Sequence, residues 1–224
     1  MITYTRTANA GGILEMDGVR ILLDGVSQAV NDYLATPPDL LNTLYDTHLD
    51  MIAFTHNHSD HFQPEFVRSY VKHHPLPKLI GPKDVAADLS DYAVITASSS
   101  VGAVQLIAVP SRHMGAEYTD TPHYSFLIRG SSLVWFMGDA SPLQWKGQDH
   151  FPHPDVLIAP YAYASTEAAW EITEQITQGK ILLTHLPDKE RDSAQLWPAV
   201  EKVLEQHDRF RVRIPRMGDV CEVY

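Results

Sequence analysis

A run of metal-ligating residue types stands out in the first third of this 224-residue sequence. Between His56 and His61 the order is His-Asn-His-Ser-Asp-His, so that four of six consecutive residues can bind a metal ion. Residues two apart in an extended chain project to the same side, and His56 and His58 can therefore reach one ion. A following turn would carry Asp60 and His61 toward another. The spacing predicts a site for two adjacent metal ions.

A simpler interpretation is an exposed turn that happens to be rich in histidine. For a lone His-x-His pair this interpretation would be preferred, because short motifs recur by chance. Here the complete string is longer, lies inside the chain and directly follows the apolar run at residues 51–55, so it is not a terminal tag. The longer string therefore favours the metal site.

The elements that would position these side chains are predicted from hydrophobic periodicity and from turn residues. Asp17-Gly18 is typical of a tight hairpin turn. Residues 26–49 form a long connection, interrupted by Pro37-Pro38, that we expect to border the site. The predicted strands are residues 2–5, 12–16, 19–23, 51–55, 78–80, 104–109, 124–129, 132–137, 156–159, 181–184, 209–213 and 220–224, and the predicted helices are residues 39–45, 64–74, 83–92, 165–177 and 194–206.

Strands with intervening helices in both halves, together with hairpins, predict an α/β fold in which two mixed sheets pack together and helices cover them outside. This arrangement is a four-layer αββα sandwich. The length of the chain fits a single domain over residues 1–224. Its composition, with 44% apolar and 20% charged residues, is typical of a globular protein. We expect the chain to fold alone.

Acidic residues outnumber basic ones by 28 to 17, for a formal charge of −11, which opposes non-specific binding to nucleic acid or to an anionic membrane. A small-molecule substrate, even an anionic one, is compatible with this charge because bound cations would dominate the potential in a cleft. No signal peptide or membrane-spanning run is evident, and Cys221 is the only cysteine, so we expect a cytoplasmic protein. Oligomeric state is left open.

The His56–His61 string and its place after a strand resemble the metallo-β-lactamase superfamily, and the resemblance extends over nearly all of the chain. It implies the αββα fold and two metal ions. By this resemblance one ion would be held by His56, His58 and His113, the other by Asp60, His61 and His185, with Asp139 bridging both. Asp24 would orient a ligand from behind.

Each isolated residue in this set also has an ordinary interpretation. His113 alone is weak evidence for a ligand. Asp24 and Asp139 follow predicted strands, where aspartate often caps a turn, and His185 could be a hydrogen-bonded core histidine. Their order along the chain, each after a strand as in the superfamily, favours the metal site over coincidence.

This sequence differs from several subgroups of the superfamily at positions that define their function, and these differences reduce the number of functions to consider. The β-lactam-hydrolysing members with a cysteine ligand carry it near the position of Asp139, which disfavours antibiotic hydrolysis. Flavodiiron oxidoreductases carry glutamate at the position of His58, and the motifs of the tRNA-processing members are missing. Compact length and the segment at residues 159–163 are most similar to small bacterial hydrolases related to sugar-phosphate lactonases.

The resemblance implies a dinuclear hydrolase. Two divalent cations lower the pKa of a shared water toward neutrality, and the resulting hydroxide could attack an ester, a lactone or a phosphodiester. We expect zinc, with manganese or iron as alternatives. An iron-dependent oxidoreductase of the same fold and a catalytically silent metal-binding protein remain alternative functions.

Three residues are predicted to take part in catalysis. Asp60 would lie beside the attacking water. Tyr161 and Tyr163 precede a predicted helix, in a loop expected at the mouth of the cleft, where a hydroxyl could donate to a developing oxyanion. Ordinary core packing is the alternative for either tyrosine. His123, His150 and His153 are the next candidates.

Overall fold

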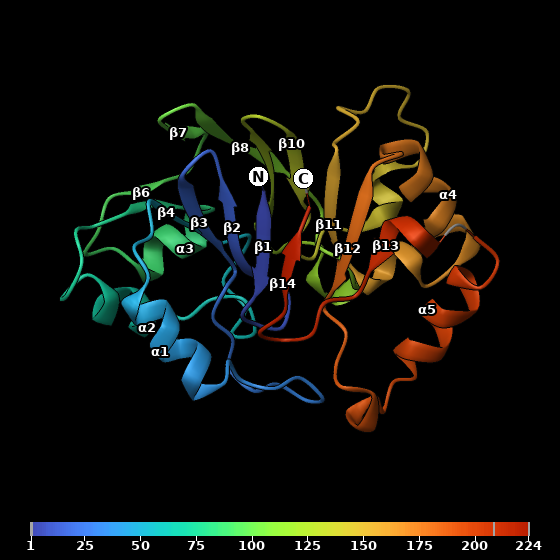
Figure 1. Ribbon diagram of the computed structural model, residues 1–224, viewed down its shortest axis with the longest axis horizontal. Helices are drawn as coiled ribbons and strands as arrows, with labels where there is room; N and C mark the ends of the chain where they lie inside the picture. Colours follow the sequence, from blue (N-terminus) through green and yellow to red (C-terminus); the bar gives the residue numbers. More distant parts are fainter. Residues whose placement is uncertain (1, 208, 224) are drawn as a thin grey trace.

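The computed structural model describes residues 2–207 and 209–223. Two seven-stranded sheets pack face to face, with helices α1, α2 and α3 beside one sheet and α4 and α5 beside the other (Figure 1). The predicted four-layer αββα sandwich is confirmed. Within the described ranges, no helix is both long and apolar enough to cross a lipid bilayer.

The first sheet has the strand order β14-β1-β2-β3-β4-β5-β6. Its first four strands in this order pair antiparallel, and β3 to β6 pair parallel. The strands are β1 (Thr3–Arg6), β2 (Gly12–Met16), β3 (Val19–Leu23), β4 (Met51–Ala53), β5 (Lys78–Ile80), β6 (Val94–Ile95) and β14 (Val220–Glu222). The helices beside this sheet are α1 (Pro38–Asp46), α2 (Pro64–Tyr70) and α3 (Lys83–Asp88).

The second sheet has the order β13-β12-β11-β10-β9-β8-β7, parallel from β13 to β10 and antiparallel from β10 to β7. Its strands are β7 (Ser99–Val101), β8 (Val104–Pro110), β9 (Tyr124–Arg129), β10 (Leu133–Phe136), β11 (Val156–Pro160), β12 (Lys180–Thr184) and β13 (Val212–Arg213). The helices beside it are α4 (Glu167–Ile176) and α5 (Leu196–Leu204).

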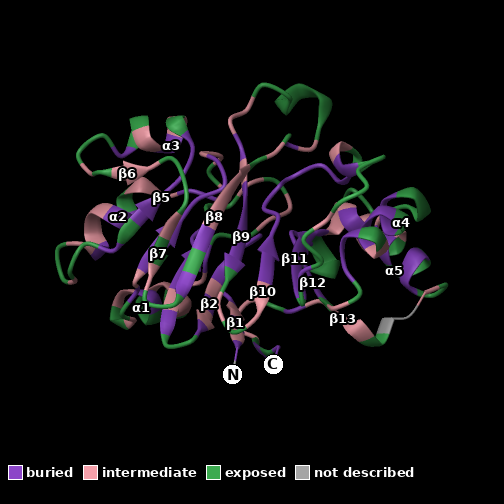
Figure 2. Cartoon of the chain, turned by 90° about the horizontal axis from the view of Figure 1, so that it is seen from above, coloured by how far each residue is buried: buried purple, intermediate pink, exposed green. Residues whose placement is uncertain are grey.

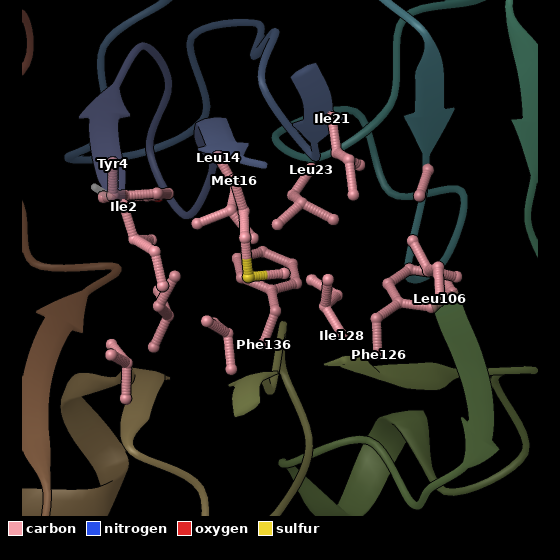
Figure 3. Packing of buried hydrophobic residues seen from close by; sticks show 14 of the residues in the cluster. Ile2, Tyr4, Leu14, Met16, Ile21, Leu23, Leu106, Phe126, Ile128 and Phe136 are labelled. Atoms are coloured by element: carbon pink, nitrogen blue, oxygen red, sulfur yellow. The ribbon is translucent and has the colours of Figure 1, made fainter. Parts of the chain in front are cut away.

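Apolar side chains fill the space between the sheets as well as the space beneath each helical layer. In the central core, Leu14 and Met16 of the first sheet face Phe126 and Phe136 of the second (Figure 3). Buried positions follow the strands through the middle of the molecule, while exposed positions lie mainly on helices and connecting loops (Figure 2). Strands buried on both faces read as continuous apolar runs, as β4 and β11 do.

The predicted turn at Asp17-Gly18 joins β2 to β3, and both residues have positive φ, at 53° and 76°. This conformation matches the twist of a two-residue hairpin, and glycine adopts it readily. Other boundaries differ from the prediction. Helices α2 and α3 end earlier than predicted, and the sequence pattern does not predict the short strands β6 and β7.

The predicted strand over residues 209–213 is wrong in its first part. A 3₁₀ helix spans Arg209–Arg211, and only Val212–Arg213 forms a strand, β13, which pairs with β12. The predicted strand over residues 220–224 is confirmed as β14, except that Tyr224 lies outside the described residues.

Five strand ends meet along one edge of the two sheets. Strands β3 and β4 are parallel neighbours in the first sheet. In the second sheet, β8 and β10 each pair antiparallel with β9, and β11 and β12 run parallel to β10, so the carboxyl ends of β8, β10 and β12 lie at the same edge. Loops that leave these ends can converge on one place, as ligand-binding loops in open sheets do.

Candidate metal centre

Every histidine and aspartate that the sequence singled out as a ligand follows one of these strand ends. His56 comes directly after the short extension of β4, His113 after β8, Asp139 after β10 and His185 after β12. The structure brings all seven proposed ligands together: the ligand atoms of each histidine group lie within 4.8 Å of one another, and the facing ring and carboxylate atoms of six of the seven residues are 3.3–3.6 Å apart. Strands therefore position the cluster, and loops contribute its side chains.

The first group consists of His56, His58 and His113, whose ligand atoms lie within 4.8 Å of one another. Nε2 of His113 is 3.3 Å from Nε2 of His56. Nδ1 of His113 faces the carbonyl of Met114, so it must carry the proton, which leaves Nε2 with a free lone pair. Burial, with the neighbouring rings, holds the pKa of His56 well below its usual value. Neutral imidazoles of this kind are metal ligands.

The second group consists of Asp60, His61 and His185, again with ligand atoms within 4.8 Å. Oδ2 of Asp60 is 3.3 Å from Nε2 of His185 and 3.6 Å from Nε2 of His61. The side-chain amide of Asn9 donates to the same carboxylate oxygen at 3.2 Å. Asn9 was not singled out in the sequence, because it lies 51 residues from Asp60 and only packing brings it there.

Asp139 lies between the two groups. Its Oδ1 is 3.4 Å from Nε2 of both His61 and His185, and its Oδ2 is 3.5 Å from Nε2 of His113. Burial opposes ionisation of Asp139, but the facing rings of His185 and His61 outweigh it and hold its pKa well below the usual range. One ionised carboxylate with an oxygen toward each group has the arrangement that can bridge two cations.

The charge balance of the cluster suits a cation. Although burial disfavours a charged ring, the carboxylates of Asp139 and Asp60 raise the pKa of His185 to about 9. Nε2 of His61 and Oδ1 of Asp139 are buried and form no hydrogen bond in the described structure. Buried polar atoms without hydrogen bonds are destabilising, and a metal ion bound by these residues would satisfy them. The residues present therefore fit divalent metal ions.

Asp24 supports the cluster from behind. Its carboxylate accepts hydrogen bonds from the backbone N–H of Thr55 at 2.8 Å, the Thr55 hydroxyl at 2.5 Å and Nδ1 of His61 at 2.9 Å. Burial raises the pKa of Asp24, and the hydrogen bonds from His61 and Thr55 oppose this rise. Since its oxygens are already engaged, Asp24 orients His61 so that Nε2 faces the cluster, a common arrangement around metal-binding histidines.

The backbone is in the left-handed region at three places in these loops. φ is 44° at Asp24, 52° at Gly138 and 58° at His185. A Cβ added at Gly138 would lie 2.5 Å from Cγ2 of Thr55, so only glycine permits this close approach of the two loops. Such strained positions concentrate at functional sites.

His123 also belongs to the site. Its Nε2 accepts from the backbone N–H of Asp139 at 3.0 Å, and its Nδ1 lies 2.8 Å from the hydroxyl of Ser111. Burial lowers the pKa of His123 to about 3, so its ring is neutral. His123 fixes the backbone of Asp139 rather than its carboxylate. His153, by contrast, lines a different cavity, beside α4.

The sequence model of the beta-lactamase superfamily domain matches residues 19–187, about three quarters of the chain. The chain belongs to the beta-lactamase superfamily. The matched range contains all seven clustered residues and Asp24. No curated protein matches the sequence significantly.

Solved structures share the superfamily fold at low sequence identity. A metallo hydrolase, Igni18, from Ignicoccus hospitalis is 18% identical with a TM-score of 0.67, and the match covers 98% of this chain and 97% of that one. A possible metal-dependent hydrolase from Veillonella parvula is 16% identical with a TM-score of 0.68, and covers 98% of both chains. CmlA, a diiron β-hydroxylase from Streptomyces venezuelae, is 15% identical with a TM-score of 0.64, over 98% of this chain and 53% of that one. These likenesses show the fold.

The two tyrosines that the sequence predicted at the mouth of the metal cleft, Tyr161 and Tyr163, differ in their surroundings. Tyr161 is half-buried, and its ring centroid is 6.2 Å from that of His185. Tyr163 is fully buried in the core beneath α4, where its hydroxyl accepts a hydrogen bond from the indole N–H of Trp145 at 2.8 Å. The prediction that Tyr163 faces a substrate is therefore wrong, because residues two apart in the 3₁₀ helix Tyr161–Ala164 point in different directions.

A tyrosine that the sequence did not indicate lies beside the cluster instead. Tyr33, in the loop between β3 and α1, packs edge-on against His185 with ring centroids 4.7 Å apart. The loop containing residues 26–49 thus borders the site, as predicted. The length of this loop was the only feature of the sequence that pointed to the site, since nothing in the local pattern distinguishes Tyr33.

Proposed function

We propose that this protein is a hydrolase that depends on two divalent metal ions. One ion would be held by His56, His58 and His113, the other by Asp60, His61 and His185, and Asp139 would bridge them. The observation that carries the proposal is the buried cluster, in which a single carboxylate faces both histidine groups. Family membership supports it.

When bound, such ions make water a nucleophile near neutral pH and stabilise negative charge on a carbonyl or phosphoryl oxygen. Asp60, which accepts a hydrogen bond from the Asn9 amide, would accept a proton or a hydrogen bond from the attacking water. Tyr161, whose ring centroid is 6.2 Å from that of His185, would donate its hydroxyl proton in a hydrogen bond to the substrate oxygen on which charge develops. The reaction class that fits these roles is hydrolysis of an ester, lactone or phosphodiester.

Zinc is the metal that we propose, because the donor set is rich in imidazole nitrogen with a few carboxylate oxygens. Manganese and iron also accept such donors. The fold similarity to the diiron hydroxylase CmlA supports one competing proposal, an iron-dependent oxidoreductase. Metal content together with turnover distinguishes these two functions.

We expect about two divalent ions per chain after reconstitution, because each proposed group supplies three donors and shares Asp139. The measurement is elemental analysis of protein purified without added metal and after reloading, followed by a panel of chromogenic phosphodiester, lactone, thioester and β-lactam substrates. His58→Ala should reduce the content to about one ion, whereas His73→Ala, in the exposed turn that follows α2, should leave it unchanged. Metal content that never exceeds about one ion in the unmodified protein would refute the dinuclear site.

Paired phenylalanine substitutions separate the two tyrosines. Tyr161→Phe should lower turnover by about tenfold or more with little change in thermal stability, since it deletes one donor near the reacting atoms. Tyr163→Phe should leave turnover unchanged but lower the free energy of unfolding by about 1–3 kcal/mol, since the buried indole N–H of Trp145 loses its acceptor. Steady-state kinetics and thermal unfolding of both variants measure these effects. Unchanged kinetics in Tyr161→Phe would remove that hydroxyl from the mechanism.

A further inference from the structure

A cavity of about 540 Å³ lies beside the second histidine group. Tyr33 and Asp32 contribute one wall, from the loop between β3 and α1, and Tyr161 contributes another. The remaining wall comes from the segment between β12 and α5, including Pro187 and Ala194. Loops from three separate parts of the chain thus line one open pocket.

This cavity, which we call the Tyr33–Tyr161 pocket, adjoins the candidate metal centre. The ring of His185 has Tyr33 at 4.7 Å and Tyr161 at 6.2 Å between ring centroids, and Pro187 follows it by two residues. A substrate whose scissile bond lies at the second histidine group would therefore extend one of its ends into the pocket.

Both tyrosine hydroxyls can donate hydrogen bonds there. Burial raises the pKa of Tyr33 and of Tyr161, and the negative charge of Asp139 raises both further. The Tyr33 hydroxyl donates to the backbone carbonyl of His185 at 3.5 Å, which is the long limit for a hydrogen bond. Both side chains therefore remain neutral donors, with one of them only weakly engaged.

The side chains that line the pocket include one charged group, the carboxylate of Asp32, and this group disfavours an anion. Among its described lining residues there is no lysine, arginine or histidine. Asp32 accepts two hydrogen bonds from Ser193, which hold the pKa of its carboxyl below the usual value and keep it ionised. Arg191 directs Nε to the backbone carbonyl of Asp32 at 3.3 Å, and its charge also lowers the pKa of the Asp32 carboxyl, but it is not among the lining residues. Pro187 and Leu196 add apolar surface.

From this placement we propose that the Tyr33–Tyr161 pocket binds the uncharged portion of the substrate next to the scissile bond, so that neutral esters or lactones are preferred over carboxylated or phosphorylated ones. The inference rests on the proposed hydrolase function for the chemistry, but the pocket itself exists without it. Tyrosine hydroxyls recognise a neutral oxygen or nitrogen, the apolar wall accepts carbon, and the carboxylate of Asp32 repels negative charge.

A matched pair of esters tests the preference in the metal-loaded protein. The probes are p-nitrophenyl butyrate and the p-nitrophenyl monoester of glutarate, which differ by one terminal carboxylate. We expect kcat/KM to be at least about tenfold higher for the butyrate, because the second ester must bring its charge toward Asp32. Ala194→Arg places a cation at the pocket rim and should reduce this ratio by about fivefold or more.

Ala168→Arg is the matched control. Ala168 is also exposed and also lines a cavity, but that cavity lies against α4 and contains none of the clustered residues. The control should keep the wild-type ratio. Equal ratios for Ala194→Arg and Ala168→Arg, or no preference in the unmodified protein, would overturn the pocket assignment while leaving hydrolysis intact.

A binding measurement separates the pocket from the chemistry. Metal-free protein in chelator is titrated with butyranilide and with the monoanilide of glutarate, and binding is followed by ligand-observed NMR. Stronger binding of butyranilide, with the difference diminished in Ala194→Arg and retained in Ala168→Arg, supports the pocket even if no substrate is hydrolysed. Binding of neither anilide, or equal binding of both, contradicts it.

Discussion

Asp60→Ala should lower turnover by about a thousandfold, which corresponds to about 4 kcal/mol of transition-state stabilisation. The carboxylate is ionised: burial opposes its ionisation, but His61 and His185 outweigh burial and hold its pKa below the usual range. Removing it takes away a proposed ligand of the second ion and the proposed acceptor for the attacking water. The expected loss is therefore mainly in kcat.

The fold should survive this substitution. The Asp60 side chain is 14% exposed and lies in a turn, so its removal creates no closed core cavity. Asp149→Ala, an exposed position in the loop before β11, is the matched control and should keep wild-type kinetics. Circular dichroism, metal content and steady-state rates are measured on both variants. Near-wild-type turnover of Asp60→Ala with two ions still bound would exclude Asp60 from the mechanism.

The sequence predicted the central residues of the candidate site because these residues are close together in the chain. His56, His58, Asp60 and His61 lie within six residues, directly after an apolar strand, and short-range geometry is enough to group them. His185 and the other distant residues came from the family resemblance. Their meeting depends on strand order, which periodicity does not specify.

What the sequence failed to predict depends on contacts between distant segments. Strand β6 has only two residues and exists through parallel pairing with β5, for which a local pattern gives no signal. Tyr33 and Asn9 reach the cluster through loop packing. Tyr163 was placed wrongly because a 3₁₀ helix, rather than an extended loop, follows β11 and turns its ring into the core.

Asp24→Ala is expected to have the largest effect on stability. Asp24 is fully buried, and its loss would leave the Thr55 N–H, the Thr55 hydroxyl and Nδ1 of His61 without their acceptor. Leaving several buried donors unpaired lowers the free energy of unfolding by about 3–5 kcal/mol. Asp24→Asn keeps the volume and one acceptor oxygen, so it should be affected less. Asp46→Ala, at the exposed end of α1, should change stability by less than about 0.5 kcal/mol.

A comparison with and without metal shows whether Asp24 acts only on the fold or also on the metal centre. If Asp24 orients His61 toward the second ion, Asp24→Asn should weaken metal affinity by about 10–100-fold. At a fixed metal concentration above saturation, the stabilisation that metal adds to unfolding would then fall by about 1.4–2.7 kcal/mol. A purely structural role would lower the unfolding midpoint equally in chelator and in metal. Identical metal-induced stabilisation in Asp24→Asn and the wild type would therefore assign Asp24 to folding alone, and His61 would have to be oriented by its other contacts in the cluster.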